Sequence, residues 1–466
     1  MSFHETISNL IEEKRQKLIE ISDKIWGFSE TRYEEYQSAE LLCTTLEEEG
    51  FSVERSAGGL ETAFVGSYGS CKPVIAILGE YDALPGLSQK AGLTTKDPLN
   101  GVGNGHGCGH NLLGTGSLAA ALAVRHYMEQ NGLKGTVRYY GCPAEEGGGG
   151  KAYMARAGLF KDVDIALTWH PFDENLAYNC KMLATCQVFF KFKGKSTHAS
   201  FSPHLGRSGL DAVELMNVGA NFLREHIIPE ARLHYAITNA GGLAPNVVQA
   251  EAEVLYKIRA PKMHQVSEIR ERIFDIARGA ALMTGTQVEI QYDAASADLI
   301  PNVTLGSLMH HHFVKHGAQS YTQEEIVFAK AMQATFSEEE RKVIGNHNGK
   351  VISDQVNPFS AKTGFFAGST DVGDVSWLVP TGQVYVATCA YGTPFHSWQL
   401  VAQGKSSIAH KGMLLAGKVL ASSAIEVMQN PVLVEQAKKE HKEQLAGEVY
   451  TSLIPPEAKP TAVKSA

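Results

Sequence analysis

The feature that most constrains the fold is an alternation of apolar, strand-like runs with helix-like segments in the first third of the chain. The strand-like runs are PVIAILGEYDALP (73–85), GTVRYYGCPAEEGGGG (135–150) and VDIALTWHP (163–171). Strands that alternate with helices are typical of a parallel sheet covered by helices. Each run leads into polar residues, and the carboxyl ends of such strands form the edge where ligands bind. We therefore predict a ligand site at this edge.

The pattern changes near residue 186. The stretch CQVFFKFKGKSTHASF alternates as a strand does, and the segments after it predict a β-α-β-β-α-β order. We predict a two-domain α/β fold, in which a mostly parallel central sheet flanked by helices carries an inserted α+β, ferredoxin-like domain. The predicted ranges are 1–185 and 299–450 for the main domain, 186–298 for the insert and 451–466 for a flexible tail.

Composition and charge exclude several classes of partner. The 466-residue chain has a net charge of −8 and no large basic cluster, which argues against nucleic acid or an anionic membrane surface. No run of about 18 apolar residues occurs, so no membrane span is expected. The charged, amphipathic N-terminal stretch does not have the pattern of a signal peptide. The seven cysteines are scattered without a C-x-x-C pair, which favours reduced thiols and a cytoplasmic protein.

A glycine-rich loop, GNGHGCGHNLLGTG (103–116), places His106, Cys108 and His110 at alternate positions before a predicted helix. A phosphate loop, a structural zinc knuckle and part of a catalytic metal site are all compatible with such a loop. No second ligand pair follows at zinc-finger spacing. The later glycine run 147–150 lacks the Lys-Ser/Thr pair of a phosphate loop and follows two acids that would repel phosphate. A catalytic metal site is therefore favoured, and His106 is not expected to be a ligand, because three adjacent donors would crowd one ion.

Five polar groups are expected to meet at one edge of the sheet. They are Glu80 with Asp82, Cys108 with His110, Glu145 with Glu146, His170, and His396. Imidazole, thiolate and carboxylate groups are all metal ligands. Neighbouring side chains on an extended segment point in opposite directions. One carboxylate of the 145–146 pair can therefore bind metal while the other acts as general base on a metal-bound water. This arrangement predicts a two-metal hydrolase, and the histidines at 310–312 are expected to have no role in it.

Several long motifs resemble those of a known enzyme family. The motifs GHGCGHN, CPAEEGGGGK, TWHP, GSTDVGDVSW and GTPFHSWQLVAQGKSSIAHKGM resemble those of the di-metal amidohydrolases, or metallopeptidases, related to aminoacylase and carboxypeptidase G. Within that family, the chain is most similar to the type that hydrolyses p-aminobenzoyl-glutamate. The resemblance runs from about residue 10 to about residue 440 and includes the insert, for example HYAITNAGGLAPNVVQAEAEVLYKIRAP.

The resemblance implies a ligand set for two divalent ions per subunit, manganese or zinc. The implied ligands are Cys108, His110, Glu146, His170 and His396. The Cys108 thiolate would bridge the ions, and Asp82 would orient a ligand from the second shell. Glu145 would be the general base and later the proton donor to the leaving amine. More distant relatives have a metal-binding histidine at the position of Glu80, so Glu80 is not assigned as a ligand.

The resemblance also implies roles for the insert, as a dimerisation domain that closes over the site. His198 would reach the active site of the partner subunit and stabilise the oxyanion. Asn246 and Arg259 would bind the carboxylate of the substrate, the guanidinium in a fork geometry. Asp371 and the GST segment 368–370 would line the pocket. The assembly would be either a homodimer or a heterodimer with a related subunit.

We therefore expect a metal-dependent amidohydrolase of N-acyl amino acids, with p-aminobenzoyl-glutamate as the favoured small-molecule substrate. One alternative is a dipeptidase for β-alanyl or basic dipeptides, and another is a hydrolase of indole or other aromatic acyl conjugates. A basic carboxylate-binding pocket would favour glutamate, whereas an acidic pocket would favour lysine or ornithine. The non-enzyme alternative is a catalytically silent binding subunit of a hetero-oligomer, and the intact Glu145 with its complete ligand set argues against it.

Overall fold

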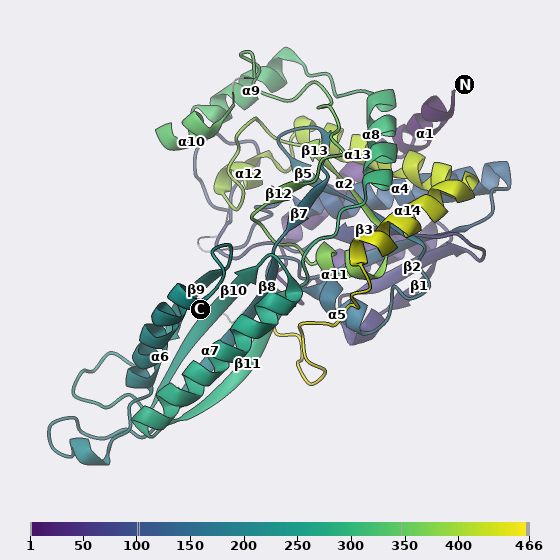
Figure 1. Ribbon diagram of the computed structural model, residues 1–466. Coiled ribbons are helices and arrows are strands. Elements are labelled where there is room, and N and C mark those ends of the chain that lie inside the picture. The colour runs from purple at the N-terminus through teal and green to yellow at the C-terminus, as the bar shows by residue number, and fades with distance from the viewer. Residues whose placement is uncertain (1, 100, 102, 346, 463–466) are drawn as a thin grey trace.

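The computed structural model of the protein describes residues 2–99, 101, 103–345 and 347–462 (Figure 1). Within these residues, seven strands form a central sheet in the order β1-β2-β4-β3-β5-β13-β6. They are β1 (Ser52–Arg55), β2 (Phe64–Gly69), β3 (Val74–Glu80), β4 (Thr136–Cys142), β5 (Ile165–Phe172), β6 (Leu176–Ala177) and β13 (Thr381–Ala387). The four central strands, β4, β3, β5 and β13, pair in parallel, whereas the pairings toward both edges are antiparallel. The predicted parallel sheet is thus confirmed for its centre.

Helices cover both faces of the central sheet, because side chains of a strand alternate between the faces. Ile75 and Ile77 of β3 pack in a cluster with α4 (His110–Asn131) and α13 (Ser407–Gln429). Ala76 and Leu78 pack in a second cluster with α5 (Gly150–Arg156) and α11 (Val372–Leu378). The first cluster also takes residues from α1 (Phe3–Glu12), α2 (Arg15–Phe28), α3 (Tyr36–Glu48), α8 (Val303–His316) and α14 (Pro431–Leu445).

Helix α4 lies directly against β3 because glycines line its buried side. A Cβ at Gly114 would lie 2.6 Å from the carbonyl oxygen of Glu80, and a Cβ at Gly116 would lie 2.7 Å from Trp169. Gly109, with a φ of 77°, turns the chain into the helix at His110, and glycine adopts that conformation without strain. The close packing places His110 beside the end of β3, where the predicted site lies.

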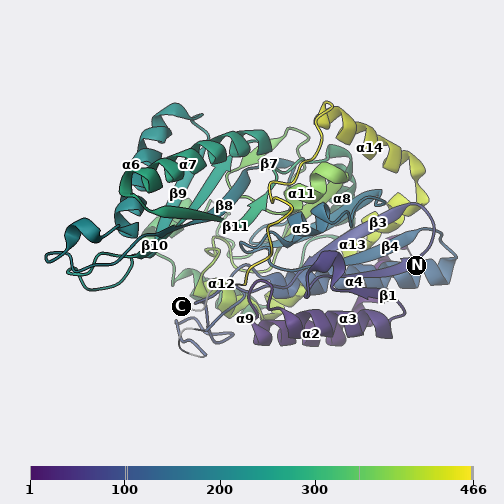
Figure 2. The same ribbon diagram turned by 90° about the horizontal axis from the view of Figure 1, so that it is seen from below.

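A second, antiparallel sheet follows in the order β11-β8-β10-β9 (Figures 1 and 2). Its elements follow one another as β-α-β-β-α-β, as the sequence predicts. They are β8 (Ala184–Lys193), α6 (Gly209–Leu223), β9 (Arg232–Asn239), β10 (Glu251–Ala260), α7 (Met263–Thr284) and β11 (Gln287–Ser296). Helices α6 and α7 pack on one face of this sheet. The opposite face of β8 and β10 is left for the cavity described below.

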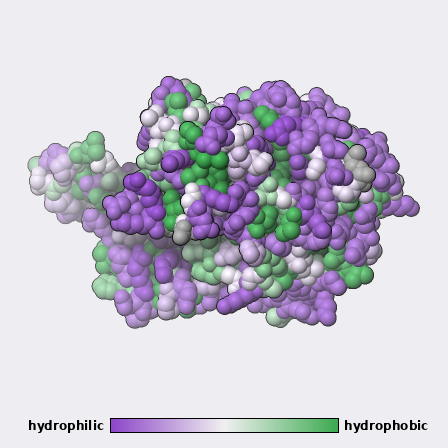
Figure 3. Space-filling view, turned by 90° about the horizontal axis from the view of Figure 1, so that it is seen from above, coloured by the Kyte–Doolittle hydropathy of each residue, from purple (hydrophilic) through white to green (hydrophobic). Residues whose placement is uncertain are grey.

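Short elements connect and flank the two sheets. They are β7 (Cys180–Met182) and β12 (Gly364–Phe366), which pair in parallel, α9 (Gln323–Gln333), α10 (Glu338–Val343), α12 (Trp398–Gln403), and 3₁₀ turns at Ala57–Gly59, Pro203–Leu205 and Arg224–His226. No helix in the described ranges is both long and apolar enough to cross a membrane. Hydrophilic residues predominate on the face shown in Figure 3, with small groups of hydrophobic residues among them.

The C-terminal segment, for which the composition predicts a flexible tail, lies against the molecule as far as it is described. Leu453 and Ile454 are buried in the same cluster as α5. The Arg156 guanidinium donates a hydrogen bond of 3.2 Å to the carbonyl oxygen of Ala458, and the Thr461 hydroxyl lies 3.3 Å from Asp293. The difference arises because two apolar side chains within a Pro- and Lys-rich stretch are enough to bury part of it.

Candidate functional site

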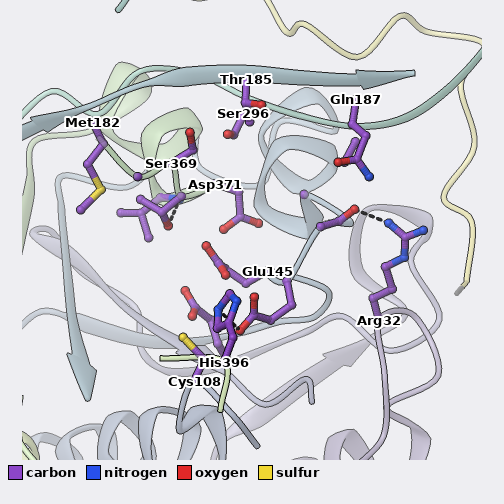
Figure 4. A pocket seen from close by; sticks show the side chains of 18 of the residues that line it. Arg32, Cys108, Glu145, Met182, Thr185, Gln187, Ser296, Ser369, Asp371 and His396 are labelled. Carbon is purple, nitrogen blue, oxygen red and sulfur yellow. Dashed lines mark hydrogen bonds and ion pairs between the residues drawn. The ribbon is translucent and has the colours of Figure 1, made fainter. Parts of the chain in front are cut away.

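A cavity of about 680 Å³ lies between the carboxyl ends of the central strands and the second sheet. In Figure 4, Cys108, Glu145 and His396 lie on one side of the cavity, and Thr185 and Gln187 of β8 lie on the other. The two sheets therefore enclose the site together. The polar residues that were predicted to meet at one edge of the sheet are found around this cavity.

The histidine, cysteine and glutamate side chains form overlapping groups suited to a metal ion, and two of these groups share Cys108. One contains Cys108, His110 and His170, and the other contains Cys108, Glu146 and His396, with the ligand atoms of each group within 4.8 Å of one another. Cys108 Sγ lies 3.4 Å from His170 Nε2, and His396 Nε2 lies 3.3 Å from Glu146 Oε1. All five residues named by the family motifs are thus brought together.

Three buried atoms at these groups make close polar contacts that do not have hydrogen-bond geometry in the described structure. His110 Nε2 and Glu80 Oε2 lie 3.3 Å apart, and Glu146 Oε1 lies 3.3 Å from His396 Nε2. Glu80 also forms a third group with His110 and Glu145. A buried polar atom without a partner is costly, and a cation is one way to satisfy it. Burial, with a contribution from Glu146, raises the pKa of the Cys108 thiol, and a bound cation would favour the thiolate. The donors present therefore fit a pair of divalent metal ions.

Asp82 holds two of these groups in place. Its Oδ1 accepts a hydrogen bond of 2.8 Å from His110 Nδ1, and its Oδ2 accepts one of 2.8 Å from the backbone N–H of Glu146. Burial disfavours the charged imidazole, but Asp82 and Cys108 outweigh it and raise the pKa of His110. With the proton on Nδ1, Nε2 is free to bind a cation. The geometry fits the orienting role that the family motifs imply for Asp82.

The adjacent carboxyl groups of Glu145 and Glu146 lie in different electrostatic environments. Burial, and then the charges of Glu80 and Asp371, raise the pKa of Glu145. Burial also acts on Glu146, but the adjacent imidazole of His396 and the charge of His110 lower its pKa to about 2. One carboxyl group is thus kept ionised among the candidate ligands, while its neighbour holds a proton more readily. This contrast is consistent with the division of labour that the sequence predicts for the pair.

An ion-pair network beside Glu145 involves a lysine that sequence reasoning missed. Lys151, at the start of α5, is completely buried, and its Nζ lies 2.6 Å from Glu80 Oε1 and 2.6 Å from Asp371 Oδ1. The backbone N–H of Lys151 also donates to Asp371, at 2.9 Å. Burial opposes ionisation of Glu80, but Lys151 and His110 outweigh it and lower its pKa. The sequence signals were that this lysine begins a short apolar helix, KAYMARAGLF, and that it ends the family motif CPAEEGGGGK.

Arg259 lies in the cavity, but His198 and Asn246 do not line it. The Arg259 guanidinium donates a hydrogen bond of 2.8 Å to Ser369 Oγ. His198 is exposed on a loop of the second sheet, where its neighbour Ala199 donates a hydrogen bond of 2.9 Å to the carbonyl oxygen of Asn246. Within one chain, His198 and Asn246 are therefore brought together with each other and not with the metal-binding groups.

Arg32 is a second residue of the cavity that no sequence motif indicated. Its guanidinium makes two hydrogen bonds, of 3.1 and 2.9 Å, with Asp293 of β11, and one of these contacts is drawn in Figure 4. It also donates to the carbonyl oxygen of Gly147, next to the glutamate pair. Arg32 thus ties the second sheet to the loop that carries Glu145.

The histidines expected to have no role lie outside the metal-binding groups. His106 is buried and its Nε2 lies 3.0 Å from the carbonyl oxygen of Ile25, and burial lowers its pKa to about 3. The histidines at 310–312 belong to α8, which contributes no residue to the cavity lining.

Comparison with known proteins gives consistent matches. The model of "Peptidase family M20/M25/M40" matches residues 76–398. A p-aminobenzoyl-glutamate hydrolase subunit of Escherichia coli (strain K12) is 49% identical over 474 residues, covering 98% of each chain. An Xaa-Arg dipeptidase of Mus musculus is 31% identical and covers 93% of this chain and 90% of its own. The solved structure of an aminobenzoyl-glutamate utilization protein from Klebsiella pneumoniae shares the fold, with a TM-score of 0.60 at 16% identity, covering 90% of this chain and 98% of its own.

Proposed function

The chain belongs to the peptidase family M20/M25/M40, and we propose that it is a metal-dependent amidohydrolase that cleaves p-aminobenzoyl-glutamate into p-aminobenzoate and glutamate. The observation that carries the proposal is the pair of overlapping metal-binding groups that share Cys108 and lie beside Glu145. The similarity over almost the whole chain to a p-aminobenzoyl-glutamate hydrolase subunit supports the substrate.

Two divalent ions, manganese or zinc, would be held by the five residues of the two groups that share Cys108. They are Cys108, His110, Glu146, His170 and His396. When bound, such ions polarise the scissile carbonyl and make water more acidic. Thiolate and imidazole ligands suit zinc, and carboxylate ligands also suit manganese, so the donor set is compatible with either metal.

Glu145 acts as general base in this proposal, because it is a carboxyl group at the cavity that has no place in either group containing Cys108. It accepts a proton from the attacking water and later donates that proton to the amine nitrogen of the leaving group. Its raised pKa, caused first by burial and then by Glu80 and Asp371, favours this double role, since a group that ionises nearer neutral pH can both take and return a proton. Asp82 keeps His110 and Glu146 in position.

Arg259 binds a carboxylate of the substrate, and the hydrogen bond to Ser369 orients its guanidinium in the cavity. His198 and Asn246 act in the active site of a partner subunit, since both are exposed, on two adjoining loops away from the cavity of their own chain. The partner is a second copy of this chain or a related subunit, as the designation of the Escherichia coli relative as a subunit suggests. The seven cysteines are free thiols, which fits a reducing, cytoplasmic location.

A dipeptidase with a basic C-terminal residue is the second candidate, because an Xaa-Arg dipeptidase is 31% identical to the chain. Both candidates use the same metal-binding groups and the same base. They differ in the charge that the cavity must offer to the side chain of the released amino acid, so a comparison of substrates separates them.

Release of p-aminobenzoate by the purified protein, with and without added manganese or zinc, tests the proposal. We expect metal-dependent release that falls by about 100-fold or more in Glu145→Gln. Metal analysis of that variant is the control, because Glu145 is not among the five assigned ligands and the metal content should stay unchanged. Absence of release with metal demonstrably bound would contradict the substrate, and full activity of Glu145→Gln would contradict the assignment of the base.

A further inference from the structure

Two basic side chains face the cavity from the second sheet. Lys257 and Arg259 are two residues apart on β10, so both point to the same face of the sheet. Both line the cavity together with their partners across β8, Gln187 and Thr185. The pair thus forms part of the wall opposite the metal-binding groups.

The other basic groups at the cavity are already neutralised by carboxylates. Arg32 is paired with Asp293 at 2.9 Å, and the buried Lys151 beneath the cavity is paired with Glu80 and Asp371. These two cations are thus already shared among three acids, Asp293, Glu80 and Asp371, and have no positive charge to spare for a further anion. Lys257 and Arg259 are the lysine and arginine of the cavity lining that make no such ion pair within the described part of the chain.

Lys257 and Arg259 have no carboxylate partner within the described part of the chain. Arg259 donates to the neutral hydroxyl of Ser369, and Lys257 makes neither a side-chain hydrogen bond nor an ion pair there. Both side chains are half-buried. Burial, and then the charge of Arg259, lower the pKa of Lys257, while the more distant charges of Glu145, Glu146 and Asp293 act in the opposite direction. Two desolvated cations side by side are unfavourable until an anion binds between them.

We propose that Lys257 is the residue that selects an acidic amino acid, by binding its side-chain carboxylate while Arg259 binds its α-carboxylate. The inference rests on the proposed function and deepens it, because it names the residue that recognises the side chain of the released amino acid. An N-acyl glutamate or aspartate supplies two carboxylates for two unpaired cations. A C-terminal lysine or arginine would instead place a third positive charge beside them, which disfavours the dipeptidase alternative.

The division between the two cations follows from their chemistry. The planar guanidinium of Arg259 suits the bidentate binding of a carboxylate held close to the scissile bond. The amine of Lys257 is a point charge on a flexible side chain. It therefore suits a side-chain carboxylate that lies one methylene group from Cα, as in aspartate, or two, as in glutamate. Lys257, Glu145 and Glu146 line the same cavity, so a substrate whose scissile amide lies beside the glutamates can present the side chain of its amino acid to the amine.

The test compares two substrates that differ only in the charge of the side chain, p-aminobenzoyl-glutamate and p-aminobenzoyl-glutamine. We expect the wild-type protein to prefer glutamate by roughly 10- to 100-fold in kcat/KM, as a charge-assisted hydrogen bond allows. Lys257→Met should lose that factor on the glutamate substrate, mostly through KM, and change the glutamine substrate by less than about threefold. Lys257→Arg, which keeps the charge, should retain most of the preference. Lys193→Met, on the same strand as Gln187 and outside the cavity lining, is the control for a lost surface charge.

Equal losses on both substrates in Lys257→Met would overturn the proposal, because they would show that Lys257 acts on the reaction and not on the side chain. Equal wild-type rates on both substrates, or a preference for p-aminobenzoyl-lysine, would overturn it as well.

Calorimetry of glutamate and glutamine binding to the metal-loaded protein tests the subsite without the acyl group. If p-aminobenzoyl-glutamate is not cleaved but glutamate still binds through Lys257, the acyl assignment fails and the inference stands. If glutamate and glutamine bind equally, the inference fails whatever the acyl group.

Discussion

The buried ion-pair network around Lys151 makes the sharpest prediction about stability. Lys151→Met replaces the amine by an apolar side chain of similar length. The substitution leaves the carboxylates of Glu80 and Asp371, each 2.6 Å from the amine, without their shared counter-ion. All three side chains are buried, so water cannot take the place of the amine.

The expected loss is about 3–5 kcal/mol in the free energy of unfolding, because removal of one partner leaves a buried charge uncompensated. Two carboxylates depend on this one amine, which favours the upper part of that range. A loss of this size lowers the unfolding temperature by roughly 6–20 °C if each kilocalorie shifts it by about 2–4 °C, as for domains of 150–250 residues. Lys438→Met is the matched control, because Lys438 Nζ is also 2.6 Å from a carboxylate, that of Asp164, but 40% of its side chain is exposed. The control should lose no more than about 1 kcal/mol.

Thermal and denaturant unfolding of the metal-loaded proteins measures both variants. The triple variant Lys151→Met, Glu80→Gln, Asp371→Asn removes the stranded charges and should recover most of the lost stability. If Lys151→Met and Lys438→Met unfold alike, the network does not stabilise the fold in the way argued. If the triple variant is less stable than Lys151→Met, the loss comes from packing and hydrogen bonds and not from uncompensated charge.

Three further outcomes can be measured. Asp82→Asn should weaken metal binding by about 10- to 100-fold, because Asp82 orients both His110 and Glu146; unchanged affinity in a manganese titration contradicts this role. Burial lowers the pKa of His316 to about 3, so below about pH 6.5 the unfolded state binds one more proton and stability falls by up to about 1.4 kcal/mol per pH unit toward pH 3. His316→Gln should reduce the slope by this amount without removing it, because the pKa values of His106 and His312 are also lowered to about 3; unfolding at several pH values checks the difference. Chelation of the metal should abolish turnover and lower the unfolding temperature, because the clustered thiol and carboxylates lose their cations; an unchanged unfolding temperature would speak against bound metal.

The chain's own pattern determined the features that depend on local sequence. Alternating strand and helix signals predicted the parallel centre of the sheet, and the β-α-β-β-α-β order predicted the second sheet. The ligand residue types were recognisable because Cys108 and His110 stand in one short motif and Glu145 and Glu146 in another. The glycines of α4 allow that helix to approach β3, so these local motifs meet where the strands end.

Only the tertiary structure decided which charges are paired. Lys151 and Asp371 are 220 residues apart, and Arg32 and Asp293 are 261 apart, so no local pattern could connect them. The same holds for Lys257, because only the folded chain shows that its amine lines the cavity without an ion pair to any described side chain. The tertiary structure also kept His198 and Asn246 outside the cavity of their own chain, because the two loops that carry them, after β8 and after β9, are exposed there. A charged residue in a sequence shows its own chemistry, but its partner and its burial are set by contacts between distant parts of the chain.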